Sequence, residues 1–183
     1  MEWLDVVDER GVPTGDVVLR ETAHTDGIRH RTSHVWILRR YGGRLQVLLQ
    51  RRAPQKDSFP GCYDISSAGH IPAGADFVDS ALRELQEELG VTARPDDLEY
   101  CGQRSFTFQS QFHGVPFHDV QVSNVYRLWL DRPAHVFRLQ AEEVSEVRWF
   151  DYVTCLQAVR QKAFPTCIYP EELRLVAKGL RLP

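Results

Sequence analysis

Three observations on the sequence predict a mixed α/β (α+β) fold. Most of the apolar residues fall into short runs bounded by turn-forming residues, which is typical of β-strands. One central segment, residues 77–89, instead repeats its apolar side chains at helical spacing. Strands and helices do not alternate along the chain, so the sequence does not predict a doubly wound parallel sheet.

The N-terminal residues predict a β-hairpin. Apolar runs at residues 3–7 and 16–19 flank the segment 11–15, which is rich in turn residues. Later runs of the same kind predict further strands, which are expected at residues 33–40, 45–51, 62–66, 98–108, 120–130 and 144–150.

The central helix is predicted together with both of its ends. Asp76 can accept hydrogen bonds from the first free amides, and Gly90 suits the position just after the last turn. The buried stripe of this helix is expected to contain Phe77, Ala81, Leu82, Leu85 and Leu89. Two more helices are expected near the C-terminus, at residues 151–161 and 170–180.

The length of the chain predicts one domain, because roughly 100–200 residues are typical of a single domain. Hydrophobic residues make up 43% of the 183 residues, which is enough for a sizeable core. Within this domain we expect an N-terminal hairpin extension at residues 1–29, a core at 30–160 and a C-terminal helix within 161–183.

Charge, hydropathy and cysteine content argue against several classes of partner. The net charge of −3 gives no electrostatic footprint for binding bulk nucleic acid. No apolar run approaches the roughly 20 residues that span a membrane, and the acidic N-terminus lacks a signal-peptide pattern. The four cysteines form no Cys-x-x-Cys pair and no zinc-binding spacing. Free thiols in a reducing compartment are therefore expected, and with them a cytoplasmic location.

Three carboxylates in the central helix are spaced for metal binding. Glu84, Glu87 and Glu88 stand at positions i, i+3 and i+4, so they project from one helix face with Cβ atoms roughly 5–6 Å apart. Like charges this close repel unless a cation lies among them. Mg²⁺ is bound by carboxylate oxygens, often together with substrate phosphates. The spacing favours a metal platform for phosphate chemistry; the alternative is a solvated acidic face.

The residues around this triplet resemble the Nudix box of the Nudix hydrolases. That pattern is Gly, five residues, Glu, seven residues, then Arg-Glu-apolar-x-Glu-Glu-x-Gly-apolar. The residues of this chain that match it are Gly69, Arg83, Glu84, Leu85, Glu87, Glu88, Gly90 and Val91, whereas Ala75 replaces the first Glu. The resemblance implies the Nudix fold, a mixed sheet between helices. It also implies that Glu84, Glu87, Glu88 and the Gly69 carbonyl hold Mg²⁺ or Mn²⁺.

The segments before the box are similar to the isopentenyl-diphosphate isomerase branch of the Nudix superfamily. They are residues 11–25 and 50–70, and the second is also similar to the Nudix domain of some plant proteins joined to a peptidase-like domain. In the isomerases, histidines matching His24, His30 and His70 take part in a divalent-metal site. Basic residues matching Arg20, Arg52 and Lys56 hold the diphosphate there.

Residue types alone support part of this assignment. Arginine offers a fork of donors to phosphate oxygens, and lysine offers a compact charge. Because strand residues alternate between faces, only one of Arg51 and Arg52 can face a cleft, and we expect it to be Arg52. His70 is expected to contact phosphate or metal. His24 and His30 are either metal ligands or hydrogen-bonded fillers, and the remaining histidines (His34, His113, His118 and His135) are expected to be structural.

The isomerase chemistry itself is not expected. The isomerases need a cysteine where this chain has Ala68 and a glutamate where it has Gln121, and neither replacement can move a proton near neutral pH. Glu84 also stands where the isomerases have a cationic contact to the diphosphate. We therefore expect a Nudix hydrolase within an isomerase-like subgroup.

The predicted reaction is hydrolysis of a diphosphate linkage in a small nucleotide or organic diphosphate. Metal-bound water would be deprotonated by a carboxylate from the box, Glu87 or Glu88, or from the loop that contains Glu142 and Glu143. Arg83 would orient one of the acids, as its counterpart does in the family. The alternatives are an isomerase-like enzyme and a non-catalytic diphosphate-binding module. The resemblance also implies that the chain can form a homodimer.

Substrate specificity is expected outside the box, in residues 106–118 and in the N-terminal hairpin. Four phenylalanines in the first segment either stack on a base, cover an isoprenoid tail or pack in the core: Phe106, Phe108, Phe112 and Phe117.

Overall fold

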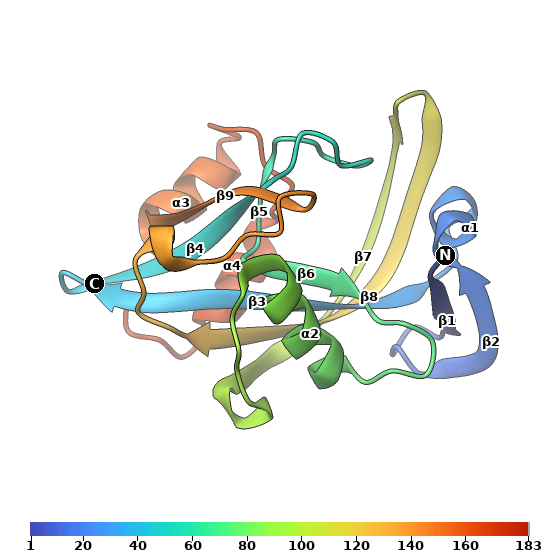
Figure 1. The fold of residues 1–183 in the computed structure, drawn as a ribbon, viewed down its shortest axis with the longest axis horizontal. Helices are drawn as coiled ribbons and strands as arrows, with labels where there is room; N and C mark the ends of the chain where they lie inside the picture. Colours follow the sequence, from blue (N-terminus) through green and yellow to red (C-terminus); the bar gives the residue numbers. More distant parts are fainter. Residues whose placement is uncertain (183) are drawn as a thin grey trace.

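A seven-stranded mixed sheet forms the centre of the computed structural model, which describes residues 1–182 (Figure 1). Its path runs β5-β4-β3-β8-β7, with β6 paired to β3 and β9 paired to β4. β3 and β8 are parallel, and the other pairs are antiparallel. The strands are β3 (His30–Tyr41), β4 (Arg44–Arg52), β5 (Tyr63–Asp64), β6 (Ser67–His70), β7 (Leu98–Phe112), β8 (Val115–Trp129) and β9 (Val144–Asp151).

Helices cover both faces of this sheet, which confirms the predicted fold class. They are α2 (Phe77–Leu89) on one face, and α3 (Tyr152–Arg160) and α4 (Pro170–Ala177) on the other, with short 3₁₀ turns at Pro95–Asp97 and Ala134–Val136. None of the helices within residues 1–182 has the length and apolar character that would let it cross a membrane.

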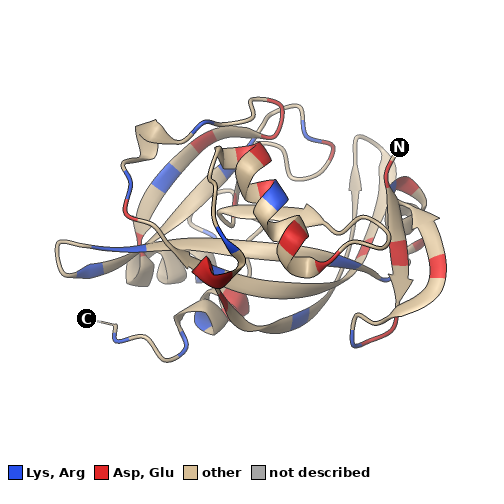
Figure 2. Ribbon diagram, turned by 60° about the horizontal axis from the view of Figure 1, so that its bottom comes forward, with Lys and Arg blue, Asp and Glu red and all other residues tan. Residues whose placement is uncertain are grey.

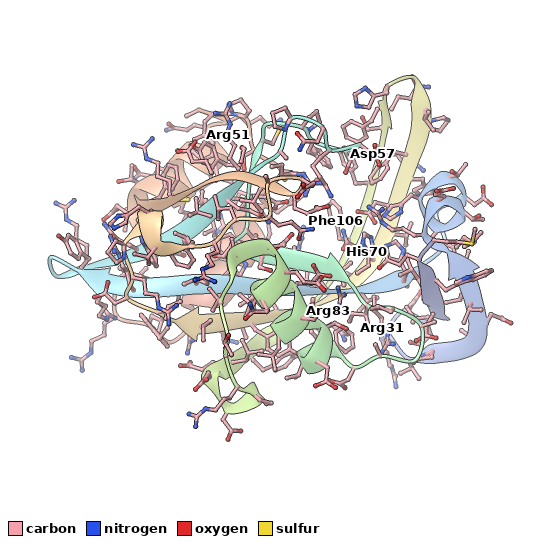
Figure 3. The ribbon with its side chains drawn as sticks, viewed as in Figure 1. Arg31, Arg51, Asp57, His70, Arg83 and Phe106 are labelled. Atoms are coloured by element: carbon pink, nitrogen blue, oxygen red, sulfur yellow. The ribbon has the colours of Figure 1, made fainter. Side chains whose placement is uncertain are left out.

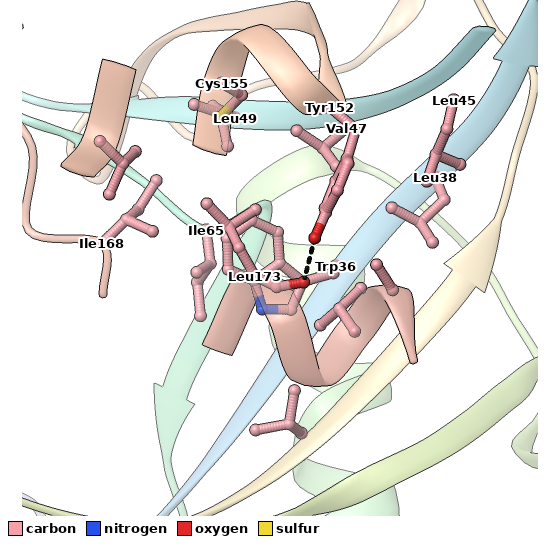
Figure 4. Packing of buried hydrophobic residues seen from close by; sticks show 14 residues of the cluster. Trp36, Leu38, Leu45, Val47, Leu49, Ile65, Tyr152, Cys155, Ile168 and Leu173 are labelled. Carbon is pink, nitrogen blue, oxygen red and sulfur yellow. Dashed lines mark hydrogen bonds between the residues drawn. The ribbon is translucent and has the colours of Figure 1, made fainter. Parts of the chain in front are cut away.

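The central strand β3 is buried on both faces because its apolar side chains alternate between two cores. Val35 and Ile37 pack with Leu85 of α2, whereas Trp36 and Leu38 pack with residues of α3 and α4. In the second core, the Tyr152 hydroxyl donates a hydrogen bond of 3.1 Å to the Leu173 carbonyl (Figure 4). This contact joins α3 to α4 and fixes α4 against the sheet.

The boundaries of α2 agree with the prediction. The Asp76 carboxylate accepts a hydrogen bond from the Val78 amide at 2.8 Å. Gly90 ends the helix with a φ of 64°, a left-handed conformation that favours glycine. Ala81, Leu85 and Leu89 are buried, and Phe77 and Leu82 are half-buried, as the helical spacing indicated.

The predicted N-terminal hairpin is present as β1 (Trp3–Val7) and β2 (Pro13–Leu19). It is followed by a short helix, α1 (Arg20–Asp26), which the sequence analysis missed. The helix ends at Gly27, whose φ is 70°. The hairpin also contacts the glycine-rich loop before α2, because the Ala73 amide donates to the Trp3 carbonyl at 2.8 Å.

Three further boundaries differ from the prediction. Residues 67–70, expected to lead into a loop, form strand β6. β7 extends to Phe112 and β8 begins at Val115. Most of the expected specificity loop 106–118 is therefore part of a long hairpin arm (Figure 1). α4 ends at Ala177, because Lys178 takes an extended conformation with ψ of 128°.

Candidate active site

A polar cavity of about 300 Å³ brings together almost all of the predicted site residues. Its walls come from α1, α2, β3, β6, β7, β8, α4 and the loop after β4. The predicted residues that line it are Arg20, Arg52, Lys56, Gly69, His70, Glu84, Glu87, Glu88 and Glu143. Arg83 is bonded to two of them.

Figure 2 shows acidic positions along the ribbon of α2. Glu84, Glu87 and Glu88 of this helix line one wall of the cavity. Arg83 bridges two of its carboxylates: it donates to Glu84 Oε1 at 2.7 Å and to Glu87 Oε2 at 2.8 Å. This arginine is the cation that the like-charged triplet requires. Its position agrees with the predicted role of orienting the acids.

Glu84 and Glu88 are the deeper acids of this wall. Burial raises the pKa of Glu84 to about 7 and that of Glu88 to about 8, and repulsion from neighbouring carboxylates adds to both shifts. The side chain of Glu87, the third acid of this wall, is half exposed to solvent. A divalent cation bound here would offset the cost of ionising both buried acids.

Gly69 lies directly under Glu84. A Cβ atom on Gly69 would lie 2.2 Å from the carboxyl carbon of Glu84, so only glycine leaves room for this carboxylate against strand β6. The neighbouring Ala68 amide lies 3.4 Å from Glu88 Oε2, at the long end of hydrogen bonding. The box glycine therefore brings the acids of α2 against the backbone of β6.

Three histidines and one aspartate form a second cluster in the cavity. His24 of α1, His30 of β3 and His70 of β6 place one ring nitrogen each within 4.8 Å of one another. Asp119 of β8 adds Oδ1, which lies 3.6 Å from His30 Nε2 and 3.7 Å from His24 Nε2. Four elements distant in sequence thus bring four ligand-type atoms together.

The hydrogen bonds behind these histidines suit metal ligands. His24 Nδ1 lies 2.9 Å from the Arg20 carbonyl and His30 Nδ1 lies 2.9 Å from the Ile28 carbonyl. A carbonyl can only accept, so each Nδ1 carries the proton and each Nε2 presents a lone pair to the cluster. Burial lowers the pKa of all three rings, to about 4 for His24, which keeps them neutral.

Two atoms of this cluster are buried without a hydrogen-bond partner in the described chain: His30 Nε2 and Asp119 Oδ1. Unpartnered buried acceptors are costly, and a cation among them would satisfy both. The donor set therefore fits a divalent metal that accepts imidazole, such as Zn²⁺ or Mn²⁺. This geometry favours the ligand interpretation of His24 and His30 over the filler interpretation.

The predicted diphosphate-binding cations line the cavity, but each is paired with a carboxylate. Arg52 lies 3.1 Å from Asp64, and Lys56 donates to Glu143. Arg20 lies 3.6 Å from Glu2. Phosphate oxygens would have to compete with these carboxylates for the same donors.

The structure shows which member of each pair of neighbouring candidate residues faces the cavity. Arg52 faces the cavity, whereas Arg51 lies outside it and donates to the Gly61 carbonyl (Figure 3). Glu143 lines the cavity, whereas Glu142 is exposed outside it. Asp76, beside the missing box glutamate, caps α2 and so does not replace that acid in the cavity.

Several residues that line the cavity were not predicted as site residues, among them His34, Arg104, Asp119 and Glu172. Asp119 stands two residues before Gln121 on one strand, so the two-residue period of a strand could have placed it on the same face. His34 is structural as predicted, in that it bonds to Glu172 at 2.8 Å, but it also lines the cavity. Glu172 had no sequence signal, because only the docking of α4 brings it there.

Aromatic side chains form the outer wall. Phe106 and Phe117 line the cavity, and Phe117 stacks on His24 with ring centroids 4.9 Å apart. Phe108 and Phe112 instead pack against Phe59 of the facing loop, with centroids 5.1 and 4.9 Å away. The four phenylalanines therefore divide between lining the cavity and packing in the wall behind it.

Comparison with known proteins agrees with the resemblance in sequence. The family model described as NUDIX domain matches residues 29–166. The chain is 42% identical over 154 residues to Nudix hydrolase 3 of Arabidopsis thaliana, a match that covers 82% of this chain and 19% of the plant protein. It is 34% identical over 143 residues to an uncharacterised Nudix hydrolase of Clostridium acetobutylicum, covering 78% of this chain and 66% of that one. It thus spans less than two thirds of both relatives.

A solved structure shows the same fold. A protein from Deinococcus radiodurans aligns with a TM-score of 0.67 at 23% identity, and the match covers 94% of this chain and 98% of that one.

Proposed function

The chain belongs to the Nudix family, and from that premise we propose that it is a divalent-metal-dependent hydrolase that cleaves a diphosphate linkage in a small nucleotide or organic diphosphate. One observation carries the proposal. The three carboxylates of α2 lie on one wall of the cavity with Arg83 between Glu84 and Glu87, and predicted phosphate-binding cations lie on the same cavity.

The residues that would hold the metal are Glu84, Glu87, Glu88 and the Gly69 carbonyl. Carboxylate and carbonyl oxygens are the ligands that Mg²⁺ prefers, and Mn²⁺ accepts them as well. A metal bound there would neutralise phosphate charge and lower the pKa of a bound water.

Two parts of the cavity wall offer candidates for the general base. The first is α2, with Glu87 or the buried Glu88, and the second is Glu143, which has Lys56 as its partner. In the second case Lys56 would orient the base and also contact the diphosphate. Arg83 would hold Glu84 and Glu87 in place while the substrate binds.

The cavity cations at the end of β4 and the start of α1 would bind the diphosphate by exchanging partners. Arg52 bonds to Asp64, and Arg20 lies close to Glu2, so each is already held near the cavity. A diphosphate carries more negative charge than one carboxylate, and it can accept several charge-assisted hydrogen bonds at once. His70 would contact either the phosphates or the metal of the histidine cluster.

The histidine cluster is a specific observation that favours the second candidate, an isomerase-like enzyme. It uses the histidines that the isomerase resemblance indicated. Ala68 and Gln121 oppose this candidate, because Gln121 accepts a hydrogen bond from Thr32 and donates one to Asp119 but cannot move a proton. The isomerase-like subgroup stays a prediction, and absence of deuterium exchange into isopentenyl diphosphate would exclude its reaction.

The test is phosphate release from a panel of nucleotide sugars, nucleoside diphosphates, dinucleotides and isoprenyl diphosphates, with and without Mg²⁺ or Mn²⁺. The variants are Glu88→Gln and the control Glu171→Gln, an exposed glutamate of α4 with an arginine partner. We expect metal-dependent turnover that Glu88→Gln reduces by on the order of 10²-fold and the control leaves unchanged. Ligand-dependent thermal stabilisation without any turnover would instead support a binding module.

A further inference from the structure

Arg104 lies across the sheet from the box. It faces Ser123 of β8 in the register of the β7–β8 pair, Ser123 faces Thr32 of β3, and Thr32 faces His70 of β6. Three strand spacings therefore separate the backbone of Arg104 from that of His70, roughly 14 Å at 4.7–4.9 Å each. Arg104 thus belongs to the wall of the cavity opposite the acids of α2.

Three contacts hold the Arg104 guanidinium in one position. Its Nη1 donates to Glu172 Oε2 at 3.1 Å. The guanidinium carbon lies 4.8 Å from the ring centre of Phe106 and 4.6 Å from that of Tyr169. A guanidinium held in this way loses little side-chain entropy when it binds a ligand.

The neighbouring His34 binds the same carboxylate as Arg104. His34 Nδ1 lies 2.8 Å from Glu172 Oε1, and its Nε2 lies 3.3 Å from the Thr32 hydroxyl oxygen, which also bonds Gln121 and Ser123. Burial lowers the pKa of His34, but the charge of Glu172 and the hydrogen bond to it outweigh burial and raise this pKa above its ordinary value.

Glu172 is shared by three donors. It accepts from His34 and Trp36 through Oε1 and from Arg104 through Oε2, and it is buried. The cavity cations Arg20, Arg52 and Lys56 each have a carboxylate partner that no second cation shares among residues 1–182. Arg104 has only one oxygen of a shared carboxylate, and its remaining guanidinium N–H groups have no hydrogen-bond partner in the described chain.

We propose that Arg104 is a specificity-determining residue that binds a second anionic group of the substrate, a carboxylate or a phosphate, on the part of the molecule that is not the diphosphate. The proposal rests on the proposed function, and it names the substrate class: diphosphates with a distal anion. Phe106 and Tyr169 would contact the segment that joins the two anionic ends. The free guanidinium fork matches carboxylate and phosphate oxygens alike.

The experiment compares pairs of compounds that differ in one distal anion. Coenzyme A with its 3′-dephospho form and NADPH with NADH test a phosphate, and UDP-glucuronate with UDP-glucose tests a carboxylate. The measured quantity is the ratio of kcat/KM within each pair. Dissociation constants in the Glu88→Gln background give the same ratio independently of hydrolysis, so failure of the proposed function is distinguishable from failure of this proposal.

The variants are Arg104→Gln, Arg104→Lys and the control Arg127→Gln. Arg127 also joins the sheet to the C-terminal segment, through the Val176 carbonyl at 3.0 Å and the Lys178 carbonyl at 3.2 Å, and it pairs with Glu99 of β7 at 2.6 Å, but it does not line the cavity. If Arg104 were only structural, as Arg127 is, replacing it would lower the stability of the chain. It would not change the ratio of kcat/KM between the two compounds of a pair.

We expect the unmodified chain to prefer the anion-bearing member of at least one pair by about 10-fold or more, the value of one well-formed charge-assisted contact. Arg104→Gln should remove this preference by lowering kcat/KM of the anion-bearing member more than that of the other member, Arg104→Lys should keep part of it, and Arg127→Gln should keep all of it. A preference that Arg104→Gln removes in the coenzyme A or NADPH pair would identify the distal group as a phosphate. A preference that it removes in the UDP-glucuronate pair would identify a carboxylate. No preference or no binding in any pair, or an equal loss for both members in Arg104→Gln, would overturn the proposal.

Discussion

The acidic face of α2 and the histidine cluster are two candidate metal-ligand sets built in opposite ways. Glu84, Glu87 and Glu88 come from five consecutive residues of one helix, and helical geometry alone puts them side by side. His24, His30, His70 and Asp119 come from α1, β3, β6 and β8, and only the sheet register brings them together. The first set offers oxygen ligands and the second mainly nitrogen ligands. One cavity can therefore separate metals by chemistry.

The two sets also carry their electrostatic cost differently. Burial raises the pKa of Glu84 and Glu88, so the acidic set is costly when it is ionised. Burial lowers the pKa of His24 and His30, so the histidine set is costly when it is protonated. A cation near either set lowers the free energy of the form that binds metal. Disrupting each set separately therefore tests whether the two sets act independently.

The largest expected effect is in the acidic set. Glu84→Gln removes one oxygen ligand and a partner of Arg83, and it should lower Mg²⁺-dependent turnover by on the order of 10²-fold. Binding of Zn²⁺ to the histidine cluster should not change. The control is Glu99→Gln, because Glu99 has an arginine partner at 2.6 Å, as Glu84 has at 2.7 Å, but lies outside the cavity. Turnover at the normal rate in Glu84→Gln would remove Glu84 from the metal site.

A smaller effect is expected in the histidine set. His30→Gln removes the lone pair of a buried nitrogen, so calorimetry should show Zn²⁺ or Mn²⁺ affinity lower by roughly 10-fold or more. Mg²⁺-dependent turnover should fall less than in Glu84→Gln, since imidazole is a poor ligand for Mg²⁺. His135→Gln, an exposed histidine, is the control. Equal loss of Mg²⁺ and Zn²⁺ binding in His30→Gln would mean that the two sets form one site.

Gly69→Ala tests the contact between β6 and the acidic set. The added Cβ would lie 2.2 Å from the Glu84 carboxyl carbon, which can move because it ends a flexible side chain. We expect the fold to remain and Mg²⁺ affinity to fall by about 10-fold, as is typical when the support of a metal ligand is disturbed. Calorimetry with Mg²⁺ and a thermal melt measure the two effects. An unchanged Mg²⁺ affinity would show that Glu84 is not held by this contact.

The difference between the two sets also decides what the sequence could predict. The spacing of residues 84–88 and the cap signals at Asp76 and Gly90 are local, so the helix and its acids were predicted. The histidines were found through resemblance, but residues alone left their role open. Asp119 shares the face of Gln121 on one strand, and this local signal was available but was not used.

Other features had no local signal. Glu172 looks like a solvent-facing residue of a short amphipathic helix, and only the packing of α4 on the sheet buries it. The helix α1 lacks a side-chain cap at Leu19, so its start carries no sequence signature. The ion pair of Lys56 with Glu143 joins residues 87 apart, and that of Arg52 with Asp64 joins β4 to β5 across a loop; no spacing rule predicts either pair.

The smallest expected effect is a pH dependence of stability in the metal-free chain. The folded pKa of Glu84 is about 7 and that of Glu88 about 8, against an ordinary value of 4.5. The folded chain therefore holds more protons than the unfolded chain, and this stability is lost as pH rises through 7 and 8. His24, with a pKa of about 4 against 6.5, has the opposite sign, but its contribution is nearly constant above about pH 7.5, where the unfolded histidine has also lost its proton.

From pH 7.5 to 8.5, stability should thus fall by about 1 kcal/mol, or roughly 2–4 °C in Tm, because the carboxyls of the unfolded chain are already ionised and those of the folded chain, mainly Glu88, release protons in this range. Melting curves in EDTA measure this fall, and saturating Mg²⁺ should cancel it. Glu88→Gln should flatten the dependence, whereas His30→Gln should leave it unchanged, because His30 does not change its charge in this range. A Tm that rises with pH in EDTA, or a slope that His30→Gln removes, would place the titrating groups in the histidine cluster instead of on α2.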